Sequence, residues 1–147
     1  MTSNLEPETL EAWRRLLFAQ AKVLSALEAD MLEQHDLPMS WFDVLGRLNQ
    51  APGKRLRMHE LEESVLFTRS GITRLADRIE ESGLIRRERS AEDRRGVYLV
   101  ITEAGIAKID EVWPDHVASI QKHFGQYLNT QDVESLRNAT QKILDHK

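Results

Sequence analysis

Residues 68–96 read TRSGITRLADRIEESGLIRRERSAEDRRG, and this stretch decides the fold. Its first half has apolar side chains at helical spacing, at positions i, i+3, i+4 and i+7, which are Ile72, Leu75, Ala76 and Ile79. Thr68 is the expected N-cap of this helix, and Gly83 followed by Leu84 predicts its C-terminal cap. The stretch therefore predicts an amphipathic helix with one buried face and one polar face.

The second half of the stretch, together with the five residues after it, predicts a two-stranded hairpin. Val97, Leu99 and Ile101 alternate with Tyr98 and Val100, which is typical of a strand with one buried face. The preceding strand carries three arginines, namely Arg86, Arg87 and Arg89. The connecting loop, residues 91–96, ends in a glycine, so the hairpin has a short polar tip.

A shorter helix is predicted directly before the amphipathic one. Residues 58–65 place Leu61 and Val65 on an inward face, and Leu66 with Phe67 leaves only a tight connection to the next helix. Leu56 is expected to add one short strand to the hairpin. The order of helix, turn, helix and hairpin predicts a winged helix-turn-helix, in a fold that is mainly α with a small β wing.

Long helices are predicted on the N-terminal side of this region. Apolar residues follow a helical period from about residue 8 to 34, at Leu10, Trp13, Leu17, Leu24, Leu27 and Met31. Pro38 ends that helix, because a residue before proline is pushed out of the α region. Ser40, with Asp43 three residues on, is the expected N-cap of the next helix.

Two further helices are predicted after the hairpin. Thr102 is expected to cap a helix that runs to about Phe124 and bends at Pro114, and Thr130 to cap the last helix. In the last helix Val133, Leu136 and Ile143 are expected to face inward.

The terminal helices have more apolar surface than a small DNA-reading unit can cover. We expect a single domain over residues 1–147, in which residues 8–36 and 103–147 form dimerisation helices and residues 39–101 form the winged helix-turn-helix region. An isologous dimer would bury the apolar faces and present two recognition helices about 34 Å apart, one turn of DNA.

The charge is distributed as a DNA-binding region requires, although the chain as a whole is acidic. The formal net charge is -4, yet residues 54–96 contain 11 Lys and Arg against 9 Asp and Glu, a net charge of +2. The acidic outer segments are expected to lie away from the phosphates.

Nine residues of this region are candidates for DNA contact. On the recognition helix they are Thr68, Arg69, Ser70, Thr73, Arg74 and Arg78, and on the wing they are Asp93, Arg94 and Arg95. Arg69 and Arg74 are expected to reach base edges in the major groove. Arg95 is expected to enter the narrow minor groove, with Asp93 fixing its direction by accepting a hydrogen bond from a guanidinium or from the loop backbone.

These motifs resemble the MarR family of bacterial transcription regulators. The resemblance rests on residues 68–80, on Gly83-Leu84-Ile85, on the tip Asp93-Arg94-Arg95-Gly96 and on residues 99–105, and it covers nearly the whole chain. It implies a homodimeric repressor on a pseudo-palindromic double-stranded DNA operator. It also implies release from DNA by a small-molecule effector, often an aromatic or phenolic acid.

The effector site is expected between the dimer-forming and DNA-reading parts. Aromatic walls and one cation would suit an aromatic carboxylate, and the candidate residues are Trp41, Phe42, Asp43, Arg47, Trp113 and His116. The alternative is that the aromatic residues are ordinary core or dimer packing.

Several other functions are not expected from this sequence. It contains no cysteine, so a disulfide, a thiolate metal site and a cysteine redox switch are excluded. The five histidines have no i, i+4 pair, and there is no glycine-rich phosphate loop or nucleophile elbow, so we expect no metal site, no cofactor and no catalytic residues. We also expect a cytoplasmic protein, because neither a membrane span nor a signal peptide is recognisable.

One alternative function remains open on the sequence. The chain could be a winged-helix protein-interaction module without specific DNA binding, in which the wing contacts a protein partner. DNA binding that weakens steeply with salt would distinguish the regulator from this module.

Overall fold

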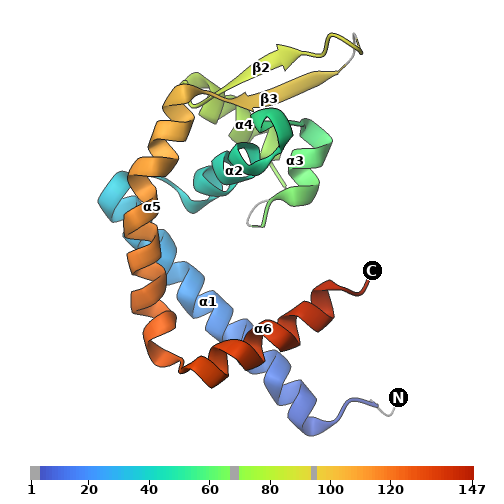
Figure 1. Cartoon of the computed structure of the whole chain (residues 1–147), viewed down its shortest axis with the longest axis vertical. Coiled ribbons are helices and arrows are strands. Elements are labelled where there is room, and N and C mark those ends of the chain that lie inside the picture. The colour runs from blue at the N-terminus through green and yellow to red at the C-terminus, as the bar shows by residue number, and fades with distance from the viewer. Residues whose placement is uncertain (1–3, 67–69, 94–95) are drawn as a thin grey trace. The chain divides into compact units, whose positions relative to one another are not determined.

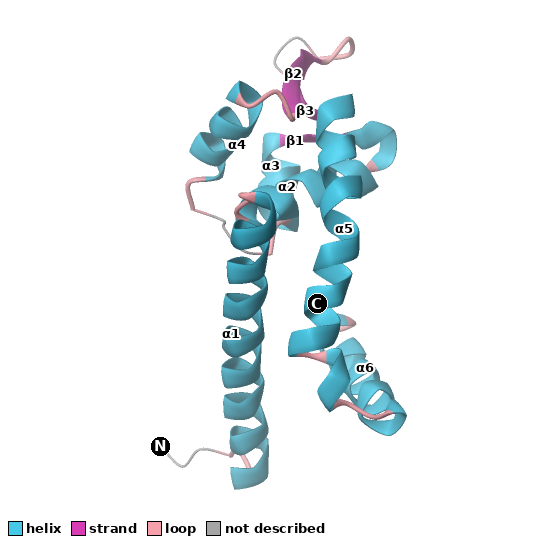
Figure 2. Cartoon of the chain, turned by 90° about the vertical axis from the view of Figure 1, so that its left-hand side faces the viewer, coloured by secondary structure: helices cyan, strands magenta, loops and turns pink. Residues whose placement is uncertain are grey.

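A computed structural model describes residues 4–66, 70–93 and 96–147 of the chain. Helices make up most of this part, and the strands are confined to one small sheet (Figure 1, Figure 2). Residues 28–116 form one compact unit and residues 1–27 with 117–147 form another. The first is called the reading unit below, and the second the terminal unit.

The elements follow the predicted order. They are α1 (Pro7–His35), α2 (Met39–Gln50), the 3-10 turn η1 (Pro52–Lys54), β1 (Arg55–Arg57), α3 (Met58–Ser64), α4 (Ile72–Glu81), β2 (Ile85–Arg89), β3 (Val97–Ile101), α5 (Glu103–His123), η2 (Gly125–Tyr127) and α6 (Thr130–Leu144). A short first strand, two helices and a hairpin make up the predicted winged helix-turn-helix.

The sheet is antiparallel with the strand order β1-β3-β2, so β3 is central. In its register Arg57 pairs with Tyr98, and Arg87 pairs with Leu99. One face packs on the helices through Leu56, Ile85, Leu99 and Ile101. The other face, called the outer face below, carries Arg55, Arg57, Arg86, Glu88, Tyr98 and Val100.

The core of the reading unit joins α2, α3, α4 and the sheet. Its fully buried side chains are Val44, Leu45, Leu48, Leu61, Ile72, Ala76, Ile79, Ile85 and Leu99. The predicted inward stripe of α4 and the inward position of Leu61 are therefore confirmed. Burial of such side chains contributes about 1.5–3 kcal/mol each, so this core fixes the angle between α3 and α4.

The start of α4 differs from the prediction. The helix begins at Ile72, and Gly71 lies just before it in the left-handed region, with φ at 76°. Gly71 was expected inside the helix. A residue in the left-handed region cannot belong to a right-handed helix, so the helix starts only after Gly71. The expected N-cap, Thr68, lies outside the described residues. The predicted glycine end is confirmed, because Gly83 has φ at 85° and its N–H donates to the Glu80 carbonyl at 2.9 Å.

Two other predicted N-caps are wrong and one is confirmed. Pro38 takes the N-cap position of α2 in place of Ser40, and Asn129 caps α6 in place of Thr130. The Asn129 side chain accepts from the Asp132 N–H at 2.8 Å, and the Asp132 carboxylate accepts from the Asn129 N–H at 3.0 Å. These two reciprocal hydrogen bonds form a capping box. Thr102 does cap α5, since its Oγ1 accepts from the Gly105 N–H at 3.1 Å.

The terminal unit leaves large apolar side chains in solvent. Trp13 on α1 is 54% exposed, Phe18 on α1 75%, and Ile143 on α6 67%. Val133 and Leu136, which were expected to face inward with Ile143, are 40% and 37% exposed. These side chains are therefore not covered within one chain, and their burial between two subunits stays a prediction.

No helix in the described ranges is long and apolar enough to cross a membrane.

Candidate nucleic-acid interface

The exposed face of α4 carries most of the predicted recognition residues. Thr73, Arg74 and Arg78 are exposed on the helix, and Ser70 is exposed just before it. The opposite side of the helix is buried, with Ile72, Ala76 and Ile79 at most 2% exposed. This arrangement presents two guanidinium groups and two hydroxyl groups on one polar surface. Arg69, the remaining predicted recognition residue besides Thr68, lies outside the described residues.

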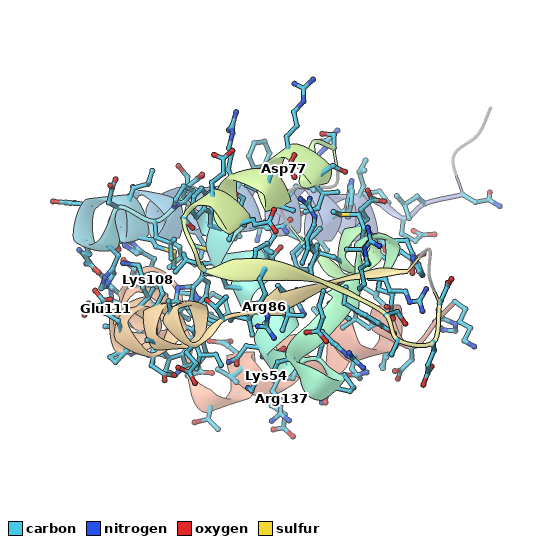
Figure 3. The ribbon with its side chains drawn as sticks, turned by 90° about the horizontal axis from the view of Figure 1, so that it is seen from above. Lys54, Asp77, Arg86, Lys108, Glu111 and Arg137 are labelled. Carbon is cyan, nitrogen blue, oxygen red and sulfur yellow. The ribbon has the colours of Figure 1, made fainter. Side chains whose placement is uncertain are left out.

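Arg87 on β2 contacts two carboxylates of α4. It was named only as one of the three arginines of the strand before the wing tip. In the structure its Nη2 contacts Asp77 Oδ1 at 2.6 Å and its Nη1 contacts Glu80 Oε1 at 2.8 Å. The hydrogen bond to Asp77 is the largest cause that raises the pKa of Arg87. Its guanidinium therefore ties β2 to α4, the helix on which Figure 3 labels Asp77.

The sequence contained a signal for this contact. Ile85 is buried, and side chains alternate between the two faces of a strand, so Arg87 must share the inward face with Ile85. Arg86 and Glu88 must then lie on the outer face, where Figure 3 shows Arg86. Counting the alternation from the buried residue would have predicted an inward arginine with a carboxylate partner on the helix.

Hydrogen bonds among residues 90–93 and Gly96 hold the base of the wing loop. Ser90 Oγ accepts from the backbone N–H groups of Glu92 and Asp93, each at 3.3 Å. The Gly96 N–H donates to the Asp93 carbonyl at 3.0 Å. The Asp93 carboxylate also accepts a hydrogen bond from Arg57 Nη1 at 3.5 Å. A guanidinium was expected as its partner, and this one comes from β1. Arg94 and Arg95 lie outside the described residues.

Asp43 is a buried carboxylate that links α2 to the segment before α4. It is 7% exposed, and Oδ2 accepts from the Leu66 N–H at 2.7 Å. Oδ1 accepts from Arg47 Nε at 3.3 Å. The sequence placed Asp43 in a cap and in the effector site and missed this contact. The available signal was its position between Phe42 and Val44 in an apolar helix, which predicts a carboxylate that needs buried partners.

Replacing Asp43 by Ala is expected to lower the free energy of unfolding by about 1–3 kcal/mol, because the Leu66 N–H loses its acceptor in a partly buried place. Asp43→Asn keeps one acceptor oxygen and is expected to cost less. Thermal unfolding of both variants measures this order. Equal stability of Asp43→Ala and the wild type would contradict the role of the carboxylate.

Five of the candidate effector residues form two separate groups in the reading unit, one aromatic and one charged. The rings of Phe42 and His116 have centroids 4.8 Å apart, and those of Trp113 and His116 6.0 Å apart. Asp43 and Arg47 form the ion pair described above. Burial lowers the pKa of His116, so its imidazole is held neutral near pH 7. The structure thus brings Phe42 of α2 together with Trp113 and His116 of α5.

Trp41 belongs to the core and not to this aromatic contact. It is partly buried and packs against the hydrophobic core, as Phe42 does. Trp113 is 53% exposed, so its indole is available to a ligand or to a partner.

Histidines and carboxylates meet at one place in the reading unit. His35 Nε2 contacts Asp115 Oδ2 at 2.8 Å, and His35 Nδ1 lies 3.7 Å from Glu111 Oε1. Within the described ranges, no group of three or more His, Asp or Glu side chains could hold a metal ion. This contact therefore joins the end of α1 to α5 as a structural pair.

Comparison with known proteins identifies the class of protein. A sequence profile described as MarR family matches residues 35–96. The structure of AbsC, a MarR family transcriptional regulator from Streptomyces coelicolor, is 33% identical, with a TM-score of 0.85 over 99% of this chain and 97% of that chain. The chain belongs to the MarR family of transcriptional regulators, and it is not an enzyme.

Two further relatives show what this class does. A second MarR family regulator from Streptomyces coelicolor, solved in complex with DNA, is 25% identical with a TM-score of 0.85, over 99% of this chain and 91% of that chain. The transcriptional regulator MhqR of Bacillus subtilis is 28% identical over 76% of this chain and 75% of its own length.

Proposed function

We propose that the protein is a cytoplasmic, homodimeric repressor that binds a pseudo-palindromic DNA operator and is released by a small aromatic acid. The observation that carries the proposal is the exposed polar face of α4, with Ser70, Thr73, Arg74 and Arg78, fixed on a buried core. A helix of this kind, beside a wing whose tip is Asp93-Arg94-Arg95-Gly96, suits a major groove and the minor groove next to it. A relative at 25% identity has been solved in complex with DNA, which supports DNA binding by this chain.

Electrophoretic mobility shift or fluorescence anisotropy with the DNA upstream of the protein's own gene tests the proposal. Each phosphate neutralised by Arg or Lys contributes about -0.9 to the slope of log affinity against log salt. Specific binding with a steep negative slope supports the repressor. Binding that is absent, or insensitive to salt, would favour the protein-interaction module instead.

The apolar surface of the terminal unit supports the homodimer. Trp13 and Phe18 on α1, and Ile143 and Leu144 on α6, are all more than half exposed in one chain. Large apolar side chains that are exposed on both terminal helices of one chain are most simply buried against a second copy.

Phe18→Glu is expected to shift the protein from a dimer toward a monomer, because a carboxylate would be buried without a partner in the apolar interface. Light scattering coupled to size exclusion is expected to give the wild type twice the 17.0 kDa mass of the chain. Glu8→Gln is a matched control at an exposed position of α1. A wild type that runs as a monomer at micromolar concentration would contradict the homodimer.

The contact of Phe42, Trp113 and His116 supports an aromatic ligand. Two aromatic rings and a neutral imidazole offer stacking surfaces, and Arg47 supplies a cation on the same helix as Phe42. A thermal-shift screen of aromatic and phenolic acids tests this part, since a ligand that binds only the folded state raises the unfolding temperature.

A further inference from the structure

Arg57 lies at the end of the edge strand β1, directly beside the wing. Its partner in the register of the sheet is Tyr98 on β3. Its backbone N–H donates to Glu60 Oε1 at 3.0 Å, at the first turn of α3. The backbone of Arg57 is therefore fixed both by the sheet and by the helix that supports α4.

The guanidinium of Arg57 reaches both ends of the wing tip. Nη1 lies 3.5 Å from Asp93 Oδ2. A Cβ atom added to Gly96 would lie 3.1 Å from Nη1 and 3.3 Å from Cζ. Gly96 itself is buried. The guanidinium thus packs against the glycine on one side of positions 94 and 95 and contacts the carboxylate on the other side.

The guanidinium of Arg57 also lies over the ring of Tyr98. The Arg57 Cζ lies 5.1 Å from the centroid of the Tyr98 ring, and the hydrogen bond to Tyr98 is the largest cause that raises the pKa of Arg57. The side chain is 31% exposed, so most of it contacts protein. A planar group that stacks on a ring while it forms an ion pair has a defined direction, which an ammonium group would not have.

We propose that Arg57 is a positioning residue: by holding Asp93 and Gly96 it fixes the base of the wing loop, and operator binding through the wing depends on it. Arg57 acts through Asp93 and Gly96 and makes no phosphate contact of its own. This inference rests on the proposed function, since its effect is read out as operator binding.

The variants Arg57→Met and Arg57→Lys test the proposal, each in the wild type and in an Arg94→Ala/Arg95→Ala background. In the wild type we expect Arg57→Met to weaken operator binding roughly 10-fold, and Lys to give no rescue, because it lacks the planar fork. In the background without wing arginines we expect less than a twofold change from either variant. Gly96→Ala is expected to weaken operator binding in the same direction but by less than Arg57→Met, because its methyl group would shift the guanidinium only slightly.

Arg55→Met is the matched control. Arg55 lies on the same strand and stacks on the same ring, with Cζ 4.3 Å from the Tyr98 centroid, but its ion pair is with Glu88 at 3.7 Å. We expect this variant to change operator affinity less than threefold. Thermal unfolding of all variants shows whether the reading unit remains folded.

Four results would overturn the proposal. If Arg57 contacts a phosphate, Arg57→Met weakens binding equally in both backgrounds, lowers the salt slope by about 0.9, and is rescued by Lys. If Arg57 is only a stability residue, the loss follows the unfolding temperature and persists without the wing arginines. If the wild type binds but Arg57→Met binds equally well, the inference alone fails, whereas absent binding by the wild type refutes the proposed function and the inference with it.

Discussion

Replacing Arg74 by Ala is expected to weaken operator binding by about 1–3 kcal/mol per half-site, or roughly 5- to 150-fold. Arg74 is exposed on α4, two residues after a buried Ile72 that fixes the direction of the helix surface. A guanidinium there can donate two hydrogen bonds to one base edge. Fluorescence anisotropy against the operator, and against operators with single base changes, measures both the affinity and the discrimination.

The discrimination separates base reading from general charge. Loss of a base contact relaxes the preference at one operator position, whereas loss of a phosphate contact weakens all sequences alike. Arg137→Ala removes the same charge from an exposed position of α6 and is the control. Equal losses for Arg74→Ala and Arg137→Ala would show that net charge alone causes the effect.

Replacing Gly105 by Ala is expected to have the largest effect on stability. A Cβ atom at this position would lie 2.3 Å from the Leu84 carbonyl oxygen and 2.6 Å from Ile101 Cγ1. The same carbonyl oxygen accepts from the Thr102 N–H at 3.0 Å, so the first turn of α5 cannot move away without losing that bond. Overpacking of this kind costs about 1–3 kcal/mol, occasionally more, and each kcal/mol lowers the unfolding temperature by about 2–4 °C at this size.

Gly46→Ala is the matched control for that experiment. Gly46 lies inside α2, and an added Cβ atom would have no neighbour within 4 Å. Alanine at such a position is expected to stabilise the protein by about 0.5–1 kcal/mol. Thermal or urea unfolding compares the two variants. A Gly105→Ala protein as stable as the wild type would show that α5 does not pack against Leu84 this closely.

The main elements of the reading unit could be predicted because they depend on local pattern. The apolar period of α4, the glycine at its end and the alternation along β3 each identify an element without knowledge of its neighbours. Leu99 and Ile101 were assigned to the buried face for this reason, and both are less than 5% exposed. Val97, assigned with them, is 42% exposed, so that part of the prediction is wrong. Thr102 was recognised as a cap because the side chain and the helix that it caps are adjacent in sequence.

The start of α4 could not be predicted in the same way. The residue types before Ile72 are compatible with a helix. Only the left-handed backbone angle of Gly71 keeps the helix from starting earlier than Ile72. A glycine takes left-handed and right-handed conformations about equally well, so its presence does not say which one the chain adopts.

The partners of the charged residues depend on contacts between distant parts of the chain. Asp93 is 36 residues from Arg57, and Asp43 is 23 residues from Leu66. Such pairs follow from the register of β1 on β3 and from the packing of α2 on α3, which no local pattern specifies. The candidate effector residues could be named but not grouped for the same reason, since Phe42 meets His116 only through the fold.

The two carboxylate contacts of Arg87 have a mechanical consequence. Because Asp77 and Glu80 fasten the helix to the strand, α4 and the β2–β3 hairpin should move as one stiff piece. A rigid unit of this kind cannot easily change its own DNA-binding surface. In the proposed dimer, ligand binding elsewhere would therefore act by changing the distance or the angle between the two units. In the proposed dimer, an effector would then release DNA by moving two rigid units apart, without unfolding either of them.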